Sequence, residues 1–331
     1  MPAVSSAEIA DCIVRAIAES GFVGQLATPG RRNPRRFIIS GTNAPTSLTA
    51  YCWTLTPGGR TALPNEYRIQ MTSVESPLPL ATDGPTILIG YEPDLNLFAG
   101  FDLREHRTFT TGSPSVQIDR AELRRAETDG LSFHRKTNGE IAVGIRSDML
   151  MAYATNAQAL HRLGRDANVF GLLNVAVHEQ PAAEDIEILS PERQRIITEV
   201  SRLSRAVDFR QRVLFAYGNR CAVTRVQLRL VDAAHILPVG VPGSSDHVRN
   251  GIALAPTYHR AFDAGLIYLD EQYRMLLNET YLHTLEDLNL TGGIETFRTQ
   301  LGERIFLPPD PQQRPRTEFI RRANRFRHIP T

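Results

Sequence analysis

The sequence is poor in cysteine, with only Cys12, Cys52 and Cys221 among its 331 residues. These three scattered residues cannot supply the two C-x-x-C pairs of a four-cysteine zinc site, and they form no disulfide framework. The sequence therefore predicts no structural four-cysteine zinc site. The same pattern suits a reducing compartment such as the cytoplasm.

Long apolar runs are also missing, since no run approaches the roughly 18 residues that a membrane-spanning helix needs. The N-terminal segment MPAVSSAEIADCIVRAIAES lacks the charged start and apolar centre of a secretory signal peptide. Both absences predict a cytoplasmic protein that has no membrane partner.

Excess charge of either sign is lacking, because the net charge is +1. Any contact with nucleic acid must therefore come from local patches. Two arginine clusters qualify, PGRRNPRR at residues 29–36, expected to be a loop between strands, and RPRTEFIRRANRFRH at residues 314–328. Either cluster can equally be ordinary solvated surface. The candidate contacts within them are Arg31, Arg32, Arg35, Arg36, Arg321 and Arg322.

The first half of the chain shows the pattern of a β-rich domain. Residues 5–19 read as an amphipathic helix capped by Ser5 or Ser6. Short β-rich runs follow, separated by turn signals. We expect a mostly antiparallel sheet of barrel-like form, with flanking helices near residues 118–128 and 147–163. The runs are FVGQLAT, RRFIISGT, SLTAYCWTLT, EYRIQMTSV, TILIGYE, NLFAGFDL and EIAVGI.

A length of 331 residues with 42% hydrophobic content suits about two domains. The segment HEQPAAEDIE, residues 178–187, is polar and contains proline, which favours a boundary there. We expect a first domain over residues 1–180 and a linker with a lead-in helix over residues 181–206. The second domain, with a basic tail, then covers residues 207–331.

The stretch from Arg220 to Gly265 carries the residues best suited to chemistry, with His235, Asn250 and His259 in this order. Hydrolysis of a phosphodiester needs a base to deprotonate water and a cation to stabilise negative charge. Imidazole titrates near neutral pH, so His235 is the candidate base. A single histidine in an apolar run is more often a core residue, but here all the features occur in order.

His259 and Asp263 lie four residues apart in PTYHRAFDAG, which begins with proline and ends with glycine as a short helix does. At this spacing both side chains leave the same face of a helix. An imidazole nitrogen and a carboxylate oxygen can then converge on one divalent cation. His259 and Asp263 are therefore the candidate metal ligands.

Residues 207–280 resemble the HNH nuclease family, in the branch with the motifs C-x-x-T, A-A-H-I-x-P, N-G-I-x-L and H-x-x-x-F-D-x-G. The resemblance implies a ββα-metal fold that binds a divalent cation, Mg²⁺ or Mn²⁺. His235 would end a short strand as the base, and the Asn250 amide would fix the base or its loop. Many members carry a further ligand directly before the base, where this chain has Ala234. The third ligand stays open between Asp232, Asp246, phosphate oxygens and water.

The whole chain is thus expected to be α+β, with a mostly antiparallel β-rich N-terminal domain with flanking helices and a C-terminal ββα-metal nuclease domain. The N-terminal half offers no second active site. A PD-(D/E)xK nuclease needs a lysine or substitute after paired acids, and the only lysine, Lys136, sits in a turn-like segment. Tyr51, Trp53 and Tyr91 could stack on an extruded base or pack in the core.

The run EYRIQM could read DNA, because strand alternation sends Glu66, Arg68 and Gln70 to one face. Arginine suits guanine, glutamine suits adenine, and glutamate suits the amino group of cytosine. The alternative is a solvated strand face with ion pairs.

Two functions follow from these patterns. In the first, the protein is a bacterial restriction-type endonuclease for double-stranded DNA whose N-terminal domain recognises a sequence or a modified base. In the second, it is a defence effector with little sequence preference, activated by a ligand or partner that the N-terminal domain senses. One HNH site cuts one strand, so a double-strand break by either route favours a homodimer.

Overall fold

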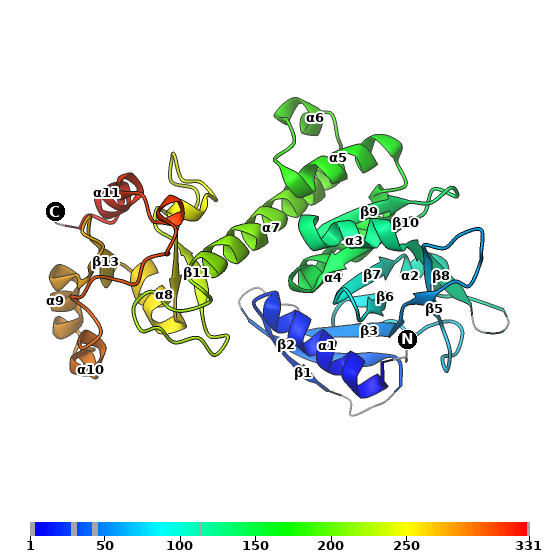
Figure 1. Cartoon of the computed structure of the whole chain (residues 1–331), viewed down its shortest axis with the longest axis horizontal. Coiled ribbons are helices and arrows are strands. Elements are labelled where there is room, and N and C mark those ends of the chain that lie inside the picture. The colour runs from blue at the N-terminus through cyan, green and yellow to red at the C-terminus, as the bar shows by residue number, and fades with distance from the viewer. Residues whose placement is uncertain (1–3, 28–31, 42–45, 111, 113, 330–331) are drawn as a thin grey trace. The chain divides into compact units, whose positions relative to one another are not determined.

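The computed structural model describes residues 4–27, 32–41, 46–110, 112 and 114–329 (Figure 1). The chain forms two compact units, residues 1–207 and 208–331. Helix α7 (Pro191–Ala216) belongs to both, since Ile196 and Val200 join the core of the first unit and Phe209 joins that of the second. Within the described ranges, no helix has the length and apolarity needed to cross a lipid bilayer.

The first unit is built on a seven-stranded sheet of order β1-β2-β3-β6-β7-β10-β9. All neighbours are antiparallel except β3 and β6, which run parallel. The expected mostly antiparallel α+β architecture is confirmed. The barrel-like form is wrong, because β1 and β9 are the two edges of an open sheet. The strands are β1 (Val23–Leu26), β2 (Arg35–Ser40), β3 (Ser47–Thr54), β6 (Thr86–Glu92), β7 (Leu97–Phe101), β9 (Leu131–Arg135) and β10 (Ile141–Arg146).

Central strands of this sheet are buried on both faces, which explains their nearly continuous apolar sequences. One face packs against α1, α4, α5 and the start of α7. The other face packs against a second sheet of order β4-β5-β8 and against α3. The second sheet consists of β4 (Thr56–Pro57), β5 (Glu66–Gln70) and β8 (Ser115–Asp119).

Helix boundaries in the first unit follow their caps. Helix α1 begins where predicted, because Ser5 and Glu8 form a reciprocal capping box. The helix expected from residue 118 begins later, since residues 115–119 pair with β5 and Asp119 caps α3. The predictions did not include β9 or α5. The helices are α1 (Ser6–Glu19), α2 (Leu103–His106), α3 (Arg120–Asp129), α4 (Leu150–Leu163), α5 (Ala167–His178) and α6 (Ala183–Glu187).

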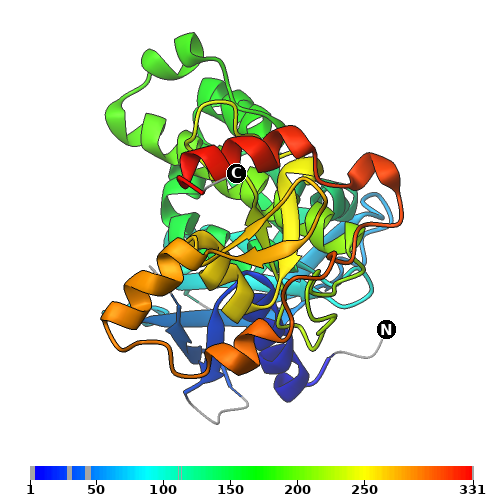
Figure 2. The same cartoon turned by 90° about the vertical axis from the view of Figure 1, so that its left-hand side faces the viewer.

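The second unit opens with a contiguous ββα motif formed by β11 (Asp232–His235), β12 (Gly251–Leu254) and α8 (Pro256–Asp263). A second hairpin follows, and α11 packs on it (Figure 2). Nδ2 of Asn324 on this helix donates to the Leu269 carbonyl at 2.9 Å. The remaining elements are β13 (Ile267–Leu269), β14 (Met275–Leu277), α9 (Glu279–Asp287), α10 (Ile294–Arg298) and α11 (Thr317–Phe326).

Candidate active site

The β11–β12 hairpin positions His235 and Asn250 at its loop end, since His235 pairs with Gly251. Asn250 is fully buried. Its Oδ1 accepts from the Leu237 amide at 2.9 Å, and its Nδ2 donates to the carbonyls of Leu237 at 3.1 Å and Ser245 at 3.0 Å. The amide therefore holds the loop that leaves His235, and it does so through backbone groups of that loop.

His235 is held by contacts that suit a general base. Its Nε2 lies 3.0 Å from Oδ1 of Asp246. A carboxylate can only accept, so Nε2 carries the proton and Nδ1 keeps the lone pair. Burial lowers the pKa of His235, with Asp246 acting in the opposite direction. The imidazole is therefore neutral near pH 7 and able to take a proton.

His259 lies between two carboxylates. Its Nδ1 is 3.8 Å from Oδ2 of Asp232, and its Nε2 is 3.3 Å from Oδ2 of Asp263. The interaction with the Asp232 carboxylate raises the pKa of His259, and Asp263 adds to this effect. The same interaction lowers the pKa of Asp232, which also lies 3.7 Å from Nη2 of Arg210.

These donors fit a divalent cation, because one imidazole and two partly exposed carboxylates combine the ligand types that such ions accept. Among the residues described, no three His, Cys, Asp or Glu side chains already surround a common point. Ala234, at the position before the base, is buried in the core. Of the two acids considered as a third ligand, Asp232 lies with His259, whereas Asp246 lies with His235.

Arg327 contacts the candidate site, and the sequence patterns did not identify it. Its Nη1 donates to the carbonyl of Ile236 at 3.0 Å, directly after the base, and its guanidinium lies 4.5 Å from the centre of the Phe262 ring. Its Nη2 is buried and has no hydrogen-bond partner in the described part of the chain. Burial lowers the pKa of Arg327, and the charge of Asp263 opposes this shift. The only sequence signal was its place in the basic tail.

The other tail arginines are engaged within the unit. Arg321 donates to both carboxylate oxygens of Glu271, at 3.1 and 2.8 Å. Arg322 donates to the Pro242 carbonyl and lies 3.6 Å from Oε1 of Glu318. DNA contacts by either side chain would have to compete with these interactions.

The arginine cluster at residues 29–36 is not a simple loop, because Arg35 and Arg36 begin β2. Arg35 is 3% exposed, and its Nη1 donates to the Cys52 carbonyl at 3.0 Å, so it supports the fold and is not available to DNA. Arg36 is exposed and paired with Asp83. Arg32 is exposed, and Arg31 lies outside the described residues.

The candidate reading face on β5 has the expected alternation, since Tyr67 and Ile69 are buried while Glu66, Arg68 and Gln70 are less so. Two polar atoms of this face, Oε1 of Glu66 and Nε of Arg68, are buried without a hydrogen-bond partner among the described residues.

The three aromatic residues considered for base stacking differ in burial. Tyr51 and Tyr91 are core residues. Trp53 is partly exposed and stacks on Tyr51 with ring centroids 6.4 Å apart.

Comparisons with known proteins bear on both units. Residues 46–154 match the family model described as Methylase-associated X1, and residues 221–270 match the one described as HNH endonuclease. No curated protein matches the sequence. Among solved structures, the chain is similar to "Modification dependent TagI restriction endonuclease" with 12% identity and a TM-score of 0.28, over 85% of this chain and 81% of that one. A likeness at that TM-score supports no argument here.

The HNH match includes the whole constellation of His235, Asn250, His259 and Asp263. The second unit therefore contains an HNH endonuclease domain, and the protein is an endonuclease.

Proposed function

We propose that this protein is a restriction-type DNA endonuclease that depends on a divalent cation and cuts DNA through its HNH site. The observation that carries the proposal is the pairing of two histidines with separate acids, His235 with Asp246 and His259 with Asp232 and Asp263. One histidine is thereby prepared as a base and the other as a ligand.

His235 begins the reaction by taking a proton from water at Nδ1, while Asp246 stabilises the imidazolium that forms. Asn250 holds the loop, so the imidazole needs little reorganisation. Arg327 can donate Nη2 to a phosphate oxygen, because this buried donor lies on a guanidinium that also contacts the residue after the base.

A divalent cation, Mg²⁺ or Mn²⁺, would be held by His259 and Asp263, and it would stabilise the charge on the phosphate and on the leaving oxygen. We assign the third protein ligand to Asp232. Its carboxylate lies 3.8 Å from His259, and it stands three positions before His235 in the sequence. Asp232 would thus supply the ligand that many HNH enzymes carry directly before the base, where this chain has Ala234.

The first unit serves recognition of a DNA sequence or a modified base in this proposal. Support comes from the description of the family matched by residues 46–154, methylase-associated, and from the partly exposed polar face of β5. A domain whose family is described as methylase-associated suits an enzyme that distinguishes DNA by its modification.

The test is cleavage of one plasmid in unmodified, cytosine-methylated and adenine-methylated forms by the full chain. We expect discrete fragments whose yield depends on modification. His235→Ala should lower the rate by about 10²–10⁴-fold, whereas His283→Ala, an exposed histidine on α9, should not. Absence of DNA cleavage under every cation tested, or equal cleavage by His235→Ala, would contradict the proposal.

We also propose that two copies act together on DNA, because each chain has one HNH match and antiparallel strands need two sites in opposite orientation. Sedimentation of His235→Ala with duplex DNA should show two chains per duplex. A monomer that leaves only nicked circles in a plasmid time course would indicate a nicking enzyme instead.

A further inference from the structure

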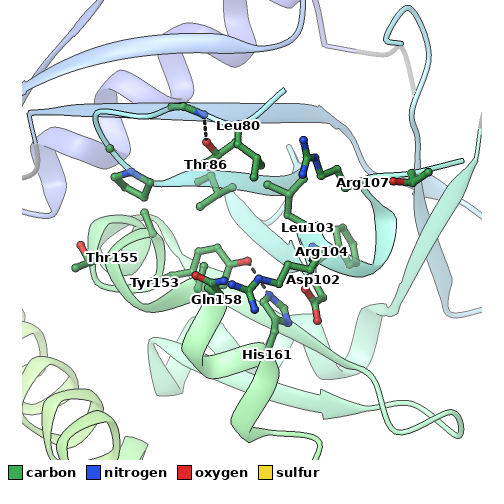
Figure 3. A pocket seen from close by; sticks show the side chains of 18 residues that line it. Leu80, Thr86, Asp102, Leu103, Arg104, Arg107, Tyr153, Thr155, Gln158 and His161 are labelled. Carbon is green, nitrogen blue, oxygen red and sulfur yellow. Dashed lines mark hydrogen bonds between the residues drawn. The ribbon is translucent and has the colours of Figure 1, made fainter. Parts of the chain in front are cut away.

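A cavity of about 790 Å³ lies in the first unit, and none of its lining residues is a candidate site residue named above. Its walls come from the loop before β6, the segment that follows β7, and α4. Tyr153, Gln158 and His161 lie on one side, with Leu80 and Thr86 on the other (Figure 3). Its volume falls within the range of roughly 300–1,000 Å³ that small-molecule sites occupy.

The floor of the cavity is a fixed and neutral pair of side chains. Nδ1 of His161 lies 3.1 Å from the Ile141 carbonyl, so it must donate, and Nε2 must accept from the Tyr153 hydroxyl at 2.9 Å. Burial lowers the pKa of His161 to about 4, which keeps the ring neutral. Gly100 lets the Tyr153 ring lie against the sheet, because a Cβ there would collide with it. Both side chains are buried, so the pair is a rigid layer beneath the cavity.

The rim carries two guanidinium groups, those of Arg104 and Arg107. In the described ranges, no acidic side chain forms an ion pair with either. Asp102, the acid of the cavity wall, is already engaged, since Oδ1 accepts from the Arg104 amide at 3.0 Å and Oδ2 from Nη2 of Arg165 at 3.4 Å. The Arg104 guanidinium lies against the Gln158 amide, and Nε of Arg107 donates to the Leu78 carbonyl. The rim therefore presents positive charge to an incoming anion.

Apolar side chains make up much of the remaining wall, including Leu80, Ile87 and Phe101. The loop that carries Leu80 is fixed by a hydrogen bond of 2.9 Å from the Ala81 amide to Oγ1 of Thr86. Apolar walls suit a planar heterocycle, and paired guanidinium groups suit a phosphate. A neutral apolar ligand would form no ion pair with the arginines of the rim, and inorganic phosphate would be too small to fill the cavity interior. Each of these ligands therefore fits only one part of the cavity.

We propose that this cavity binds a single nucleotide, with its base against the exposed apolar side chain of Leu80 and its phosphate at Arg104 and Arg107. The nucleotide is either extruded from bound DNA, in which case the inference rests on the proposed function, or a free nucleotide that controls the nuclease. Extrusion exposes a base to a closed pocket and allows a modified base to be distinguished by its shape.

The experiment uses the full chain with His235→Ala, so that DNA is bound without being cut. One arm measures binding of free dCMP, 5-methyl-dCMP, dAMP and N6-methyl-dAMP by calorimetry. The other arm measures binding of duplexes containing the same bases, with 2-aminopurine beside each to report extrusion. Arg104→Gln with Arg107→Gln should weaken binding in the responding arm by about tenfold or more.

Thr155→Trp supplies a second variant, because this exposed residue on α4 lines the cavity and a larger side chain would fill it without entering the core. It should abolish nucleotide binding while the melting temperature stays unchanged. Arg124→Gln, on the exposed face of α3, is the matched control and should bind as the parent does.

The outcomes separate the two sources. A rise in 2-aminopurine fluorescence that the cavity variants remove identifies an extruded base, and tight binding of a free nucleotide without that rise identifies a free ligand. Unchanged binding of every probe by the cavity variants overturns the inference. The proposed function is then judged separately, by DNA cleavage with His235 intact.

Discussion

The Phe209 ring lies parallel to the His235 imidazole, with ring centroids 3.8 Å apart and planes 11° apart. Phe209 comes from α7 and His235 from the end of β11, so residues 26 positions apart meet at the base. The stack fixes the plane of the imidazole, while Asp246 fixes its tautomer. These two contacts thus set both the direction and the protonation of the nitrogen that accepts a proton in the proposed reaction.

Phe209→Leu tests the stack. Leucine keeps an apolar side chain in the core, so the loss of stability should stay near 1.5 kcal/mol or less. Loss of the parallel ring should let the imidazole turn and lower the cleavage rate by about tenfold, because small errors of position are costly in catalysis. Rates at saturating DNA and thermal melting measure the two effects. Phe297→Leu, which removes a ring stacked on Tyr258 instead, should leave the rate unchanged.

Asp246→Asn should alter the pH dependence of cleavage. Burial lowers the pKa of His235 and Asp246 opposes that shift, so removing the carboxylate should lower the pKa further. In the wild type, the acidic limb of kcat/KM should lie below the ordinary imidazole value of about 6.5. In the variant, this limb should move to still lower pH, and the plateau should fall by about 10²-fold because the imidazolium loses its partner. A limb that moves to higher pH would rule out this role for Asp246.

Cation binding should depend on three residues, Asp232, His259 and Asp263. Asp232→Asn, His259→Ala and Asp263→Asn should each raise the Mg²⁺ concentration for half-maximal cleavage and weaken Mn²⁺ binding measured by electron paramagnetic resonance. Asp287→Asn, on α9, is the control. Affinity should also fall with decreasing pH, because the proton that Asp232 and Asp263 favour on His259 competes with the cation. If Asp232→Asn bound Mn²⁺ as tightly as the wild type does, the third ligand of the cation would be water or a phosphate oxygen and not Asp232.

EDTA should stop cleavage without unfolding the protein. The described cysteines are buried as free thiols, and the sequence has no four-cysteine zinc site whose loss would open the fold. Melting curves with and without EDTA should therefore coincide. Cleavage that persists after exhaustive chelation would contradict a cation-dependent reaction.

The ββα motif was expected from the resemblance to HNH nucleases, and local signals predicted the helix of that motif. Proline opens α8 and the spacing of His259 and Asp263 puts them on one turn. Sequence patterns did not identify Arg327, because this residue reaches the candidate site through the tertiary packing of α11. Arg35 was predicted as a DNA contact because it lies in a basic cluster, and such clusters are usually exposed. Tertiary contacts bury this side chain instead. Local patterns fixed ligand spacing, and long-range contacts determined which charges remain available.

Arg327→Gln tests the unpartnered donor beside the base. If Nη2 contacts a phosphate oxygen as charge develops, its loss should lower the rate by about 10²-fold, in the range seen when one preorganised donor is removed. Arg327→Lys keeps the charge but not the planar fork, so it should recover only part of the rate. Arg298→Gln on α10 is the control, because Arg298 pairs with Glu279 and lies outside both arginine clusters. If Arg327→Gln and the wild type cleaved saturating DNA at equal rates, Arg327 would have no role at the phosphate and would only pack on Phe262.

Acid should destabilise the first unit through His161. Its pKa is lowered to about 4 in the folded protein by burial, whereas an unfolded histidine titrates near 6.5. The unfolded chain therefore binds the extra proton between these values, so the stabilising contribution is complete above about pH 6.5 and is lost as the pH falls toward 4. The slope from this group is at most about 1.4 kcal/mol per pH unit. Urea unfolding across this window should show a smaller slope in His161→Gln, and an unchanged slope would mean that another group controls acid unfolding.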